Sequence, residues 1–190
     1  MLDSRGWTAL PPIQTVQQRR VRVYGRWLPQ HSRWLDNRTL DGRAGYVVVT
    51  PLRLEPAGHV LLVQRGWAPR DVSDRRHLPL PVTPDGVVEL DGELEPLPGH
   101  RMELGHSSEP GPIRQNIDLD ELSRACGQPI WALTLQQTSD SGDGLLRRWP
   151  QRDAGVATHY GYAAQWFALS LLIVTLYGWF QIRPAFRRQR

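Results

Sequence analysis

The sequence predicts a mainly β fold, a small antiparallel sheet or partly open barrel with one short helix, followed by a C-terminal transmembrane α-helix. Three observations support this prediction. About five or six short segments are apolar or alternate in polarity, with glycine- and proline-rich stretches between them, as in an all-β domain. A helical pattern precedes the last of these segments. From Tyr160 to Ile182 no side chain carries a charge.

The first strands are expected in the first half of the chain. The first alternates between arginine or tyrosine and small apolar residues, and the next two are almost wholly apolar. We expect Pro51 to end the first of these two apolar strands, and Gly66 and Pro69 to end the second. Turns are expected at Asp36-Asn37 and Asp41-Gly42, because Asn and Gly tolerate a left-handed backbone. The four expected strands are residues 20–26, 46–50, 59–65 and 87–94.

A short helix and a last strand follow a long proline-rich loop. Residues 118–126 have an acidic first turn, which suits the helix dipole, and Gly127 supplies a stop signal directly after them. Residues 129–136 then read as the last strand. We expect residues 139–157 to form a polar loop that leads into the final helix.

The final apolar run is long enough to span a bilayer. As a helix, the stretch from Tyr160 to Ile182 would measure roughly 34 Å, and a bilayer core needs roughly 20 mainly apolar residues. Aromatic residues gather at both of its ends, as they do where a helix meets lipid headgroups. The alternative is a buried core helix, which this run fits poorly because it is apolar all round and closed by arginines.

Charge and hydropathy give conflicting signals about topology. Four arginines follow the span and account for the whole net charge of +4, so the rest of the chain is balanced and gives no support for nucleic-acid binding. This tail indicates a cytoplasmic C-terminus. The first 25 residues, however, contain no apolar run that could export the domain. The expected organisation is an irregular segment (1–18), an extracytoplasmic β-rich domain (19–157), a transmembrane helix (158–182) and a basic cytoplasmic tail (183–190).

His159 is the first candidate for chemistry. Tyr162, Trp166 and Phe167 follow it at helical spacing, so the four side chains share one helix face. An imidazole on an aromatic face can ligate the iron of a heme while the rings pack on the porphyrin. From spacing alone, an interfacial histidine that anchors the helix is the more common arrangement.

A second candidate is the stretch Arg65-Gly66-Trp67-Ala68-Pro69, in which Gly permits a sharp turn and Pro fixes the next one. As structure alone it is a strand-ending turn. Other constellations fail: the remaining histidines lack zinc-ligand spacing, Cys126 has no motif that would make it a nucleophile, and no Walker loop or dinucleotide fingerprint is present.

Together these stretches resemble the surfeit locus protein 1 family, membrane proteins that assist assembly of cytochrome c oxidase. The resemblance rests on Leu35-Asp36-Asn37-Arg38, on Gly42-Arg43-Ala44-Gly45-Tyr46, on the run from Leu62 to Pro69 and on the run from His159 to Leu169. It implies two membrane helices flanking a β-rich domain outside the cytoplasm. It also implies a non-enzymatic role in delivering heme a to oxidase subunit I, with the heme a synthesis machinery and the lipid bilayer as further partners.

The family's heme-linked histidine matches His159, which makes the heme-binding interpretation the favoured one, and the family's glycine in the arginine-glycine-aromatic motif matches Gly66. Two departures stand out. Ala157 and Thr158 precede the histidine where the family often has an asparagine, and the first helix is absent. We therefore expect that the natural chain begins upstream of Met1 or that this member is truncated. Two alternatives remain: a scaffold for oxidase subunits that binds no heme, and a membrane enzyme acting on heme or quinone.

Overall fold

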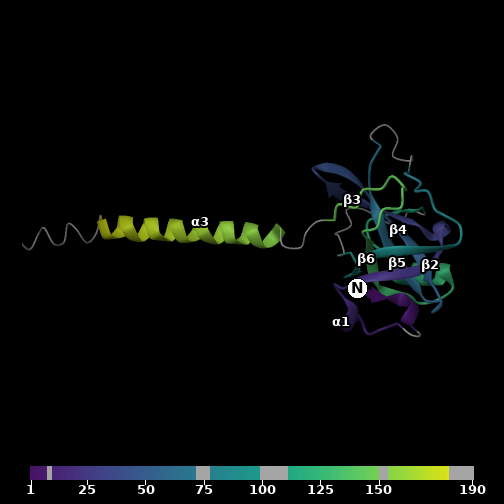
Figure 1. The fold of residues 1–190 in the computed structure, drawn as a ribbon. Coiled ribbons are helices and arrows are strands. Elements are labelled where there is room, and N and C mark those ends of the chain that lie inside the picture. The colour runs from purple at the N-terminus through teal and green to yellow at the C-terminus, as the bar shows by residue number, and fades with distance from the viewer. Residues whose placement is uncertain (8–9, 72–77, 99–110, 150–153, 180–190) are drawn as a thin grey trace, which may run out of the picture. The chain divides into compact units, whose positions relative to one another are not determined.

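Five strands close into a barrel in the computed structural model (Figure 1). Around the ring the order is β2, β4, β5, β8, β6 and back to β2, and neighbouring strands are antiparallel except for β5 and β8. This is a Greek-key barrel of the OB-fold type. The barrel strands are β2 (Arg20–Trp27), β4 (Arg43–Leu54), β5 (Val60–Pro69), β6 (Val87–Pro96) and β8 (Ile130–Gln137).

The predicted mainly β class is confirmed, but the sheet is neither open nor wholly antiparallel. β2 closes the ring because its first part pairs with β6 while its end also pairs with β4. β8 can lie parallel to β5 because a long connection that contains α2 precedes it, and parallel strands need such a crossover.

The structure describes residues 1–7, 10–71, 78–98, 111–149 and 154–179, and the chain divides into two compact units, 1–148 and 149–190. Smaller elements complete the first unit, and the second contains one long helix. These elements are β1 (Leu2–Asp3), η1 (Ser4–Gly6), α1 (Ile13–Val16), η2 (Pro29–His31), β3 (Arg33–Leu40), β7 (Ile113–Arg114), α2 (Leu119–Cys126) and α3 (Ala154–Tyr177).

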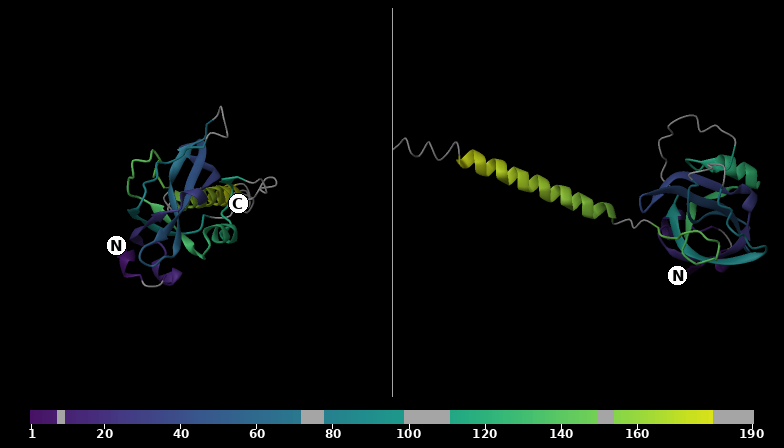
Figure 2. Two further views of the ribbon diagram at one scale, coloured as in Figure 1. Left: turned by 90° about the vertical axis from the view of Figure 1, so that its right-hand side faces the viewer. Right: turned by 90° about the horizontal axis from the view of Figure 1, so that it is seen from above.

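Alternating side chains of the barrel strands fill its interior. A second cluster lies outside the barrel wall, where Leu122 of α2 packs against Leu35, Val49 and Leu62. Figure 2 shows the helix α2 (green) against the outside of the barrel. Both faces of β5 are therefore buried, which explains why its sequence is apolar almost throughout. The buried interior cluster consists of Val16, Val21, Val23, Trp27, Leu52, Leu54, Leu61, Val63, Leu90, Leu94, Trp131, Leu133 and Leu135.

Two predicted strand ends were wrong. β4 continues through Pro51. This residue lies between the part of β4 that pairs with β3, which ends at Val49, and the part that pairs with β2, which begins at Leu52. Proline has no backbone N–H to donate. At this junction neither neighbouring strand needs that hydrogen bond, so the proline is tolerated. β5 likewise continues past Gly66, and it ends at Pro69, the other residue expected to stop it.

The predicted turn at Asp36-Asn37 was also wrong, because these residues lie within β3. Asn37 has a φ of 57°, and the pairing of β3 with β4 shifts register between Leu35 and Arg38. The left-handed residue therefore makes a β-bulge rather than a chain reversal. The second predicted turn is confirmed, since Asp41 and Gly42, with φ of 50° and 75°, connect β3 to β4.

The predicted short helix is confirmed as α2, with both of its ends. Asp118 caps the N-terminus by accepting a hydrogen bond from the Glu121 N–H at 2.9 Å. Gly127, in the left-handed region at a φ of 70°, ends the helix. The N-terminal segment that the sequence predicted as irregular contains β1, η1 and α1, and Val16 of α1 is buried in the barrel cluster.

In the second unit, α3 begins at Ala154 and ends at Tyr177, before the predicted end at 182, and the two residues after it form a wider π-helical turn. Over the described part of the chain, no helix is both long and apolar enough to cross a membrane, so the transmembrane helix predicted at 158–182 is not supported. The predicted basic tail, 183–190, lies outside the described residues.

Candidate functional site

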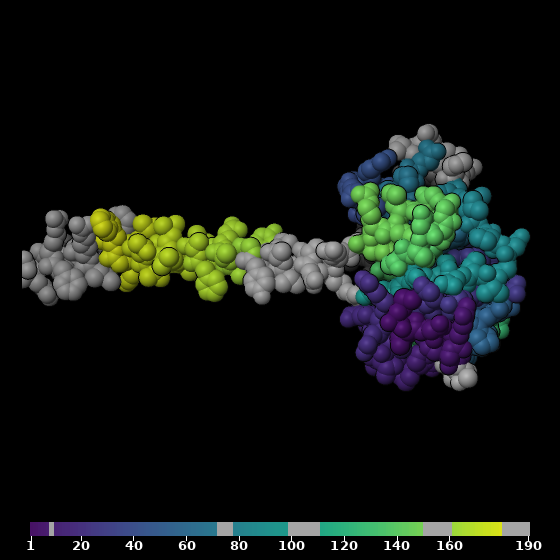
Figure 3. Space-filling model, viewed as in Figure 1, coloured from purple at the N-terminus to yellow at the C-terminus, as the bar shows by residue number. Residues whose placement is uncertain are grey.

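The Arg65–Pro69 motif forms the second half of β5 and is not a turn. One edge of this half pairs with β4, where Val47 lies opposite Trp67 and Gly45 opposite Pro69. The other edge loses its partner after Gln64, because β8 is about to end. Residues 139–148, which we call the connector, return to this vacated edge and cover it. In the space-filling view the connector (green) lies on the surface of the barrel unit (Figure 3).

Backbone hydrogen bonds fix the connector to β5. The Trp67 N–H donates to the Leu146 carbonyl at 2.7 Å, and the Leu146 N–H donates to the Trp67 carbonyl at 2.8 Å. Gly66 makes this approach possible, since a Cβ there would lie 2.7 Å from the Leu145 Cβ and 3.0 Å from the Leu146 carbonyl oxygen. Both distances are shorter than van der Waals contact. The motif therefore needs a glycine for close packing.

The Trp67 side chain ties the same segment to β3. Its indole N–H donates to the Arg38 carbonyl at 2.8 Å, and its ring is buried. A Cβ on Gly45 would lie 2.4 Å from the Trp67 ring, so a second glycine makes room for the indole. A buried tryptophan of this kind supplies both apolar contact and one directed hydrogen bond.

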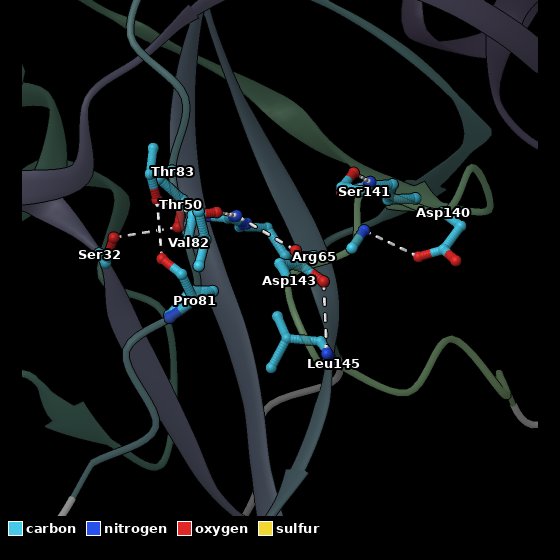
Figure 4. Close-up of polar contacts among 12 residues, drawn as sticks. Ser32, Thr50, Arg65, Pro81, Val82, Thr83, Asp140, Ser141, Asp143 and Leu145 are labelled. Carbon is cyan, nitrogen blue, oxygen red and sulfur yellow. Dashed lines mark hydrogen bonds and ion pairs between the residues drawn. The ribbon is translucent and has the colours of Figure 1, made fainter.

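Arg65 is the most deeply buried arginine in the described part of the chain, with 1% of its side chain exposed. Its Nη2 donates to the Asp143 carboxylate at 3.1 Å and to the Val82 carbonyl at 2.7 Å, and its Nη1 donates to Thr83 Oγ1 at 2.7 Å. The guanidinium also lies 4.6 Å from the Trp27 ring centroid. Figure 4 shows Arg65 between the connector on one side and the 81–83 segment on the other.

Asp143 completes the cluster from within the connector. None of its side chain is exposed, and it accepts two further hydrogen bonds from Arg147 Nη2, at 2.7 and 2.8 Å. Burial lowers the pKa of Arg65, and the neighbouring Asp143 carboxylate opposes this shift. The buried Asp143 carboxylate thus compensates two guanidinium groups, and the exposed Asp140 carboxylate, 3.4 Å from Arg147 Nη1, is a second partner of Arg147.

This arrangement can hold a chain segment, because arginine keeps its proton in proteins and the Asp143 carboxylate accepts hydrogen bonds from both Arg65 and Arg147. Burial also raises the pKa of the Cys126 thiol, which disfavours the reactive thiolate. Among the described residues, no group of three or more His, Cys, Asp or Glu side chains could hold a metal ion. The described site is therefore a docking site for the connector.

The residues predicted to bind heme lie on α3. His159 is in the helix, but its side chain lies outside the described residues. Tyr162, Trp166 and Phe167 are 59%, 66% and 77% exposed. Tyr162 and Trp166 line a small groove along the helix surface. Their role in binding heme stays a prediction.

The sequence patterns singled out Arg65, Gly66, Trp67 and Pro69 but not Asp143, which the structure pairs with Arg65. The available signal was weak: the aspartate stands between two glycines in the stretch after the last strand. No spacing rule connects it to an arginine 78 positions earlier.

Comparison with known proteins agrees with the resemblance noted from the sequence. The model of the SURF1 family matches residues 2–171, from the barrel through the connector into α3. A SURF1-like protein of Caenorhabditis briggsae is 26% identical over 148 residues, which cover 76% of this chain and 44% of that protein. The chain thus spans less than half the length of this curated relative. Because the family model covers most of the sequence, the chain belongs to the SURF1 family.

Proposed function

We propose that this chain is a non-enzymatic assembly factor for heme-copper cytochrome c oxidase. The observation that carries the proposal is the family match, because the SURF1 family is generally known for cytochrome oxidase assembly factors. The match includes both the barrel and the beginning of α3, so the described docking site and the candidate heme residues both lie inside the matched region.

The finer part of the proposal concerns heme a as cargo. His159 would ligate the heme iron, while Tyr162, Trp166 and Phe167 would pack on the macrocycle. These three aromatic side chains are exposed and therefore accessible, as a flat apolar cargo requires. The receiving partner is oxidase subunit I, and the donor is the heme a synthesis machinery.

The experiment is an optical spectrum of the purified full chain, expressed in cells that make heme a. We expect a heme a spectrum in the parent and its loss in His159→Ala. A matched control is His31→Ala, which removes an imidazole from η2 in the barrel unit and should leave the spectrum unchanged. Loss of colour in both variants, or in neither, would contradict the assignment of His159.

Oxidase assembly in cells distinguishes the cargo role from a scaffold role. We expect His159→Ala to abolish assembly of active oxidase in a strain that depends on this chain. If the variant chain is colourless but still supports full oxidase activity, it is a scaffold for oxidase subunits and the heme a part of the proposal fails.

We propose that the chain lies at the cell inner membrane, with the barrel on the extracytoplasmic side, as the resemblance implies. Fractionation should recover the chain with membranes. Protease added to intact spheroplasts should cleave the barrel unit although the cells have not been lysed. A chain that is protected until lysis would overturn this placement.

A further inference from the structure

A second surface, on the outside of the barrel, carries chemistry that the proposed assembly role does not use. It is a pocket of about 600 Å³ beside β2, bounded by η1, the end of β4, the β4–β5 turn and the start of β6. This volume is within the range of small-molecule sites, roughly 300 to 1,000 Å³. The pocket is lined by Arg5, Tyr24, Arg53, Leu54, Glu55, Pro56, Gly58 and Val87.

Strand register places the polar side chains of this pocket on one face. Arg26 of β2 lies directly opposite Arg53 of β4. Residues that lie opposite each other point to the same face of a sheet, and residues two apart along a strand do so too. Tyr24, Arg26, Arg53 and Glu55 therefore share the outer face of the barrel, while Val23 points into its core.

The charges on this face do not balance. Like charges directly opposite each other across two strands are unfavourable. Arg26 is compensated, because its Nε donates to the Glu55 carboxylate at 2.7 Å. Among the described residues, neither Arg53 nor Arg5 has a carboxylate within ion-pair distance. Two positive charges thus line the pocket without a carboxylate partner.

One of these two charges is held in place. The Arg5 guanidinium lies 3.7 Å from the centroid of the Tyr24 ring, which it covers. This stacking restrains a long side chain that would otherwise be mobile. The 3₁₀ helix η1 supports the arrangement, since Ser4 Oγ accepts a hydrogen bond from the Tyr24 N–H at 3.2 Å. The guanidinium is therefore oriented before any ligand arrives.

We propose that this pocket binds a small organic anion, a molecule with an apolar body and one carboxylate or phosphate group. Guanidinium groups recognise both of these anions through paired N–H donors. Arg5 and Arg53 bind the anionic group, and Pro56 and Val87 contact the apolar body. The site is independent of heme and of the oxidase role, so either proposal can fail while the other stands.

Binding is measured by ¹⁹F NMR on the purified full chain with three probes of similar size. These are 4-fluorobenzoate, 4-fluorophenyl phosphate and the neutral 4-fluorobenzyl alcohol. We expect one or both anions to bind, and the stronger of the two identifies the natural group as a carboxylate or a phosphate. The alcohol should not bind. Equal binding of the alcohol and the anions would overturn the proposal.

Matched substitutions locate the site. Arg5→Gln and Arg53→Gln should each weaken anion binding about tenfold, as expected for loss of a charged hydrogen-bond donor. Arg20→Gln removes an exposed arginine of β2 that does not line the pocket and should leave the affinity unchanged. Equal affinity in all three variants and the parent would show that the anion binds elsewhere.

A variant that binds the anion more tightly than the parent cannot be explained by misfolding. Glu55→Gln removes the negative charge that lines the pocket and releases Arg26 from its ion pair. We expect about three- to tenfold tighter anion binding, because charge complementarity improves. Weaker or unchanged binding in this variant would contradict the charge argument. Raising the salt concentration should reduce binding to the parent, since these charges are exposed to solvent.

Discussion

Two arginine–carboxylate pairs in this protein have similar contacts in opposite environments. Arg65 and Asp143 lie 3.1 Å apart with 1% and 0% of their side chains exposed. Arg22 and Asp91 lie 2.7 Å apart with 35% of each side chain exposed. Both are charge-assisted hydrogen bonds between strands or segments far apart in sequence. What differs between them is the access of water.

The difference changes what each pair does for the fold. Burial is the largest influence on Arg65 and lowers its pKa, whereas the hydrogen bond to Asp91 is the largest influence on Arg22 and raises its pKa. Burying a charge costs free energy because its hydration is lost, so the Arg65 pair adds little net stability. Removing one partner is nevertheless strongly destabilising, because the other charge is then buried without compensation. A surface pair is screened and easily replaced by water. The buried pair therefore specifies where the connector must lie.

The largest expected effect is that of Asp143→Asn, which keeps the shape of the side chain and removes its charge. Arg65 would then lose its counter-ion, and Arg147 would keep only the exposed Asp140 carboxylate, 3.4 Å from its Nη1. We expect the free energy of unfolding to fall by about 3–5 kcal/mol. The measurement is urea unfolding of the full chain, followed by tryptophan fluorescence.

Asp91→Asn is the matched control for that experiment. It makes the same chemical change in the half-exposed pair with Arg22, where we expect a much smaller loss because water screens the pair. A loss in Asp143→Asn no larger than in Asp91→Asn would show that the burial of the Arg65 cluster has no energetic consequence.

The second effect tests how closely the connector approaches β5. Gly66→Ala places a methyl group 2.7 Å from the Leu145 Cβ, so the connector must move. We expect a loss of about 1–3 kcal/mol, the usual cost of overpacking. Gly111→Ala is the control, because nothing lies within 4 Å of its Cβ position. Equal unfolding free energies for the two variants would mean that the connector can leave β5 freely.

Local signals in the sequence predicted the regular parts of the barrel. The alternation of residues 20–26 and the apolar run of 59–65 identified strands, and the cap residues Asp118 and Gly127 identified both ends of α2. Each of these signals is complete within one turn or one strand. The polar stretch that forms β3 has no such signal, because its pairing with β4 and β7 is what makes it a strand.

The candidate site was only half predictable, for the same reason. The Arg65-Gly66-Trp67 motif was visible, but its glycine suggested a turn and its partners were not apparent. Gly66 serves the approach of a segment about 80 residues later in the chain. The ion pair with Asp143 depends on where β8 ends, and this is set by the closed barrel rather than by any local pattern.

The third prediction concerns the other anchor of the same segment. Trp67→Phe keeps an aromatic ring but removes the N–H that donates to the Arg38 carbonyl. We expect the free energy of unfolding to fall by about 1 kcal/mol, the net value of one such hydrogen bond. Trp7→Phe is the control, since Trp7 contacts Trp131 edge-on at 5.7 Å and phenylalanine can keep that contact. A larger loss in the control would assign the effect to ring size.

The smallest effect is a pH dependence in another partly exposed cluster. The hydrogen bond from Arg33, at 2.7 Å, is the largest influence on Glu121 and lowers its pKa below the ordinary value of 4.5; Arg114 lowers it further, while burial opposes both. A carboxylate with a lowered pKa contributes stability that is complete above pH 4.5. This contribution is lost as the pH falls through the lowered value.

Arg33→Gln removes that contribution and should cost at most about 1 kcal/mol at pH 7, because 36% of the Glu121 side chain is exposed. The variant and the parent should converge in unfolding free energy as the pH is lowered below 4.5, until Glu121 is protonated in both. Arg19→Gln, an exposed arginine outside the cluster, should differ from the parent by the same small amount at every pH. If the Arg33→Gln deficit stays constant down to low pH, Arg33 stabilises the fold through packing, and this surface cluster resembles the buried one more than its exposure suggests.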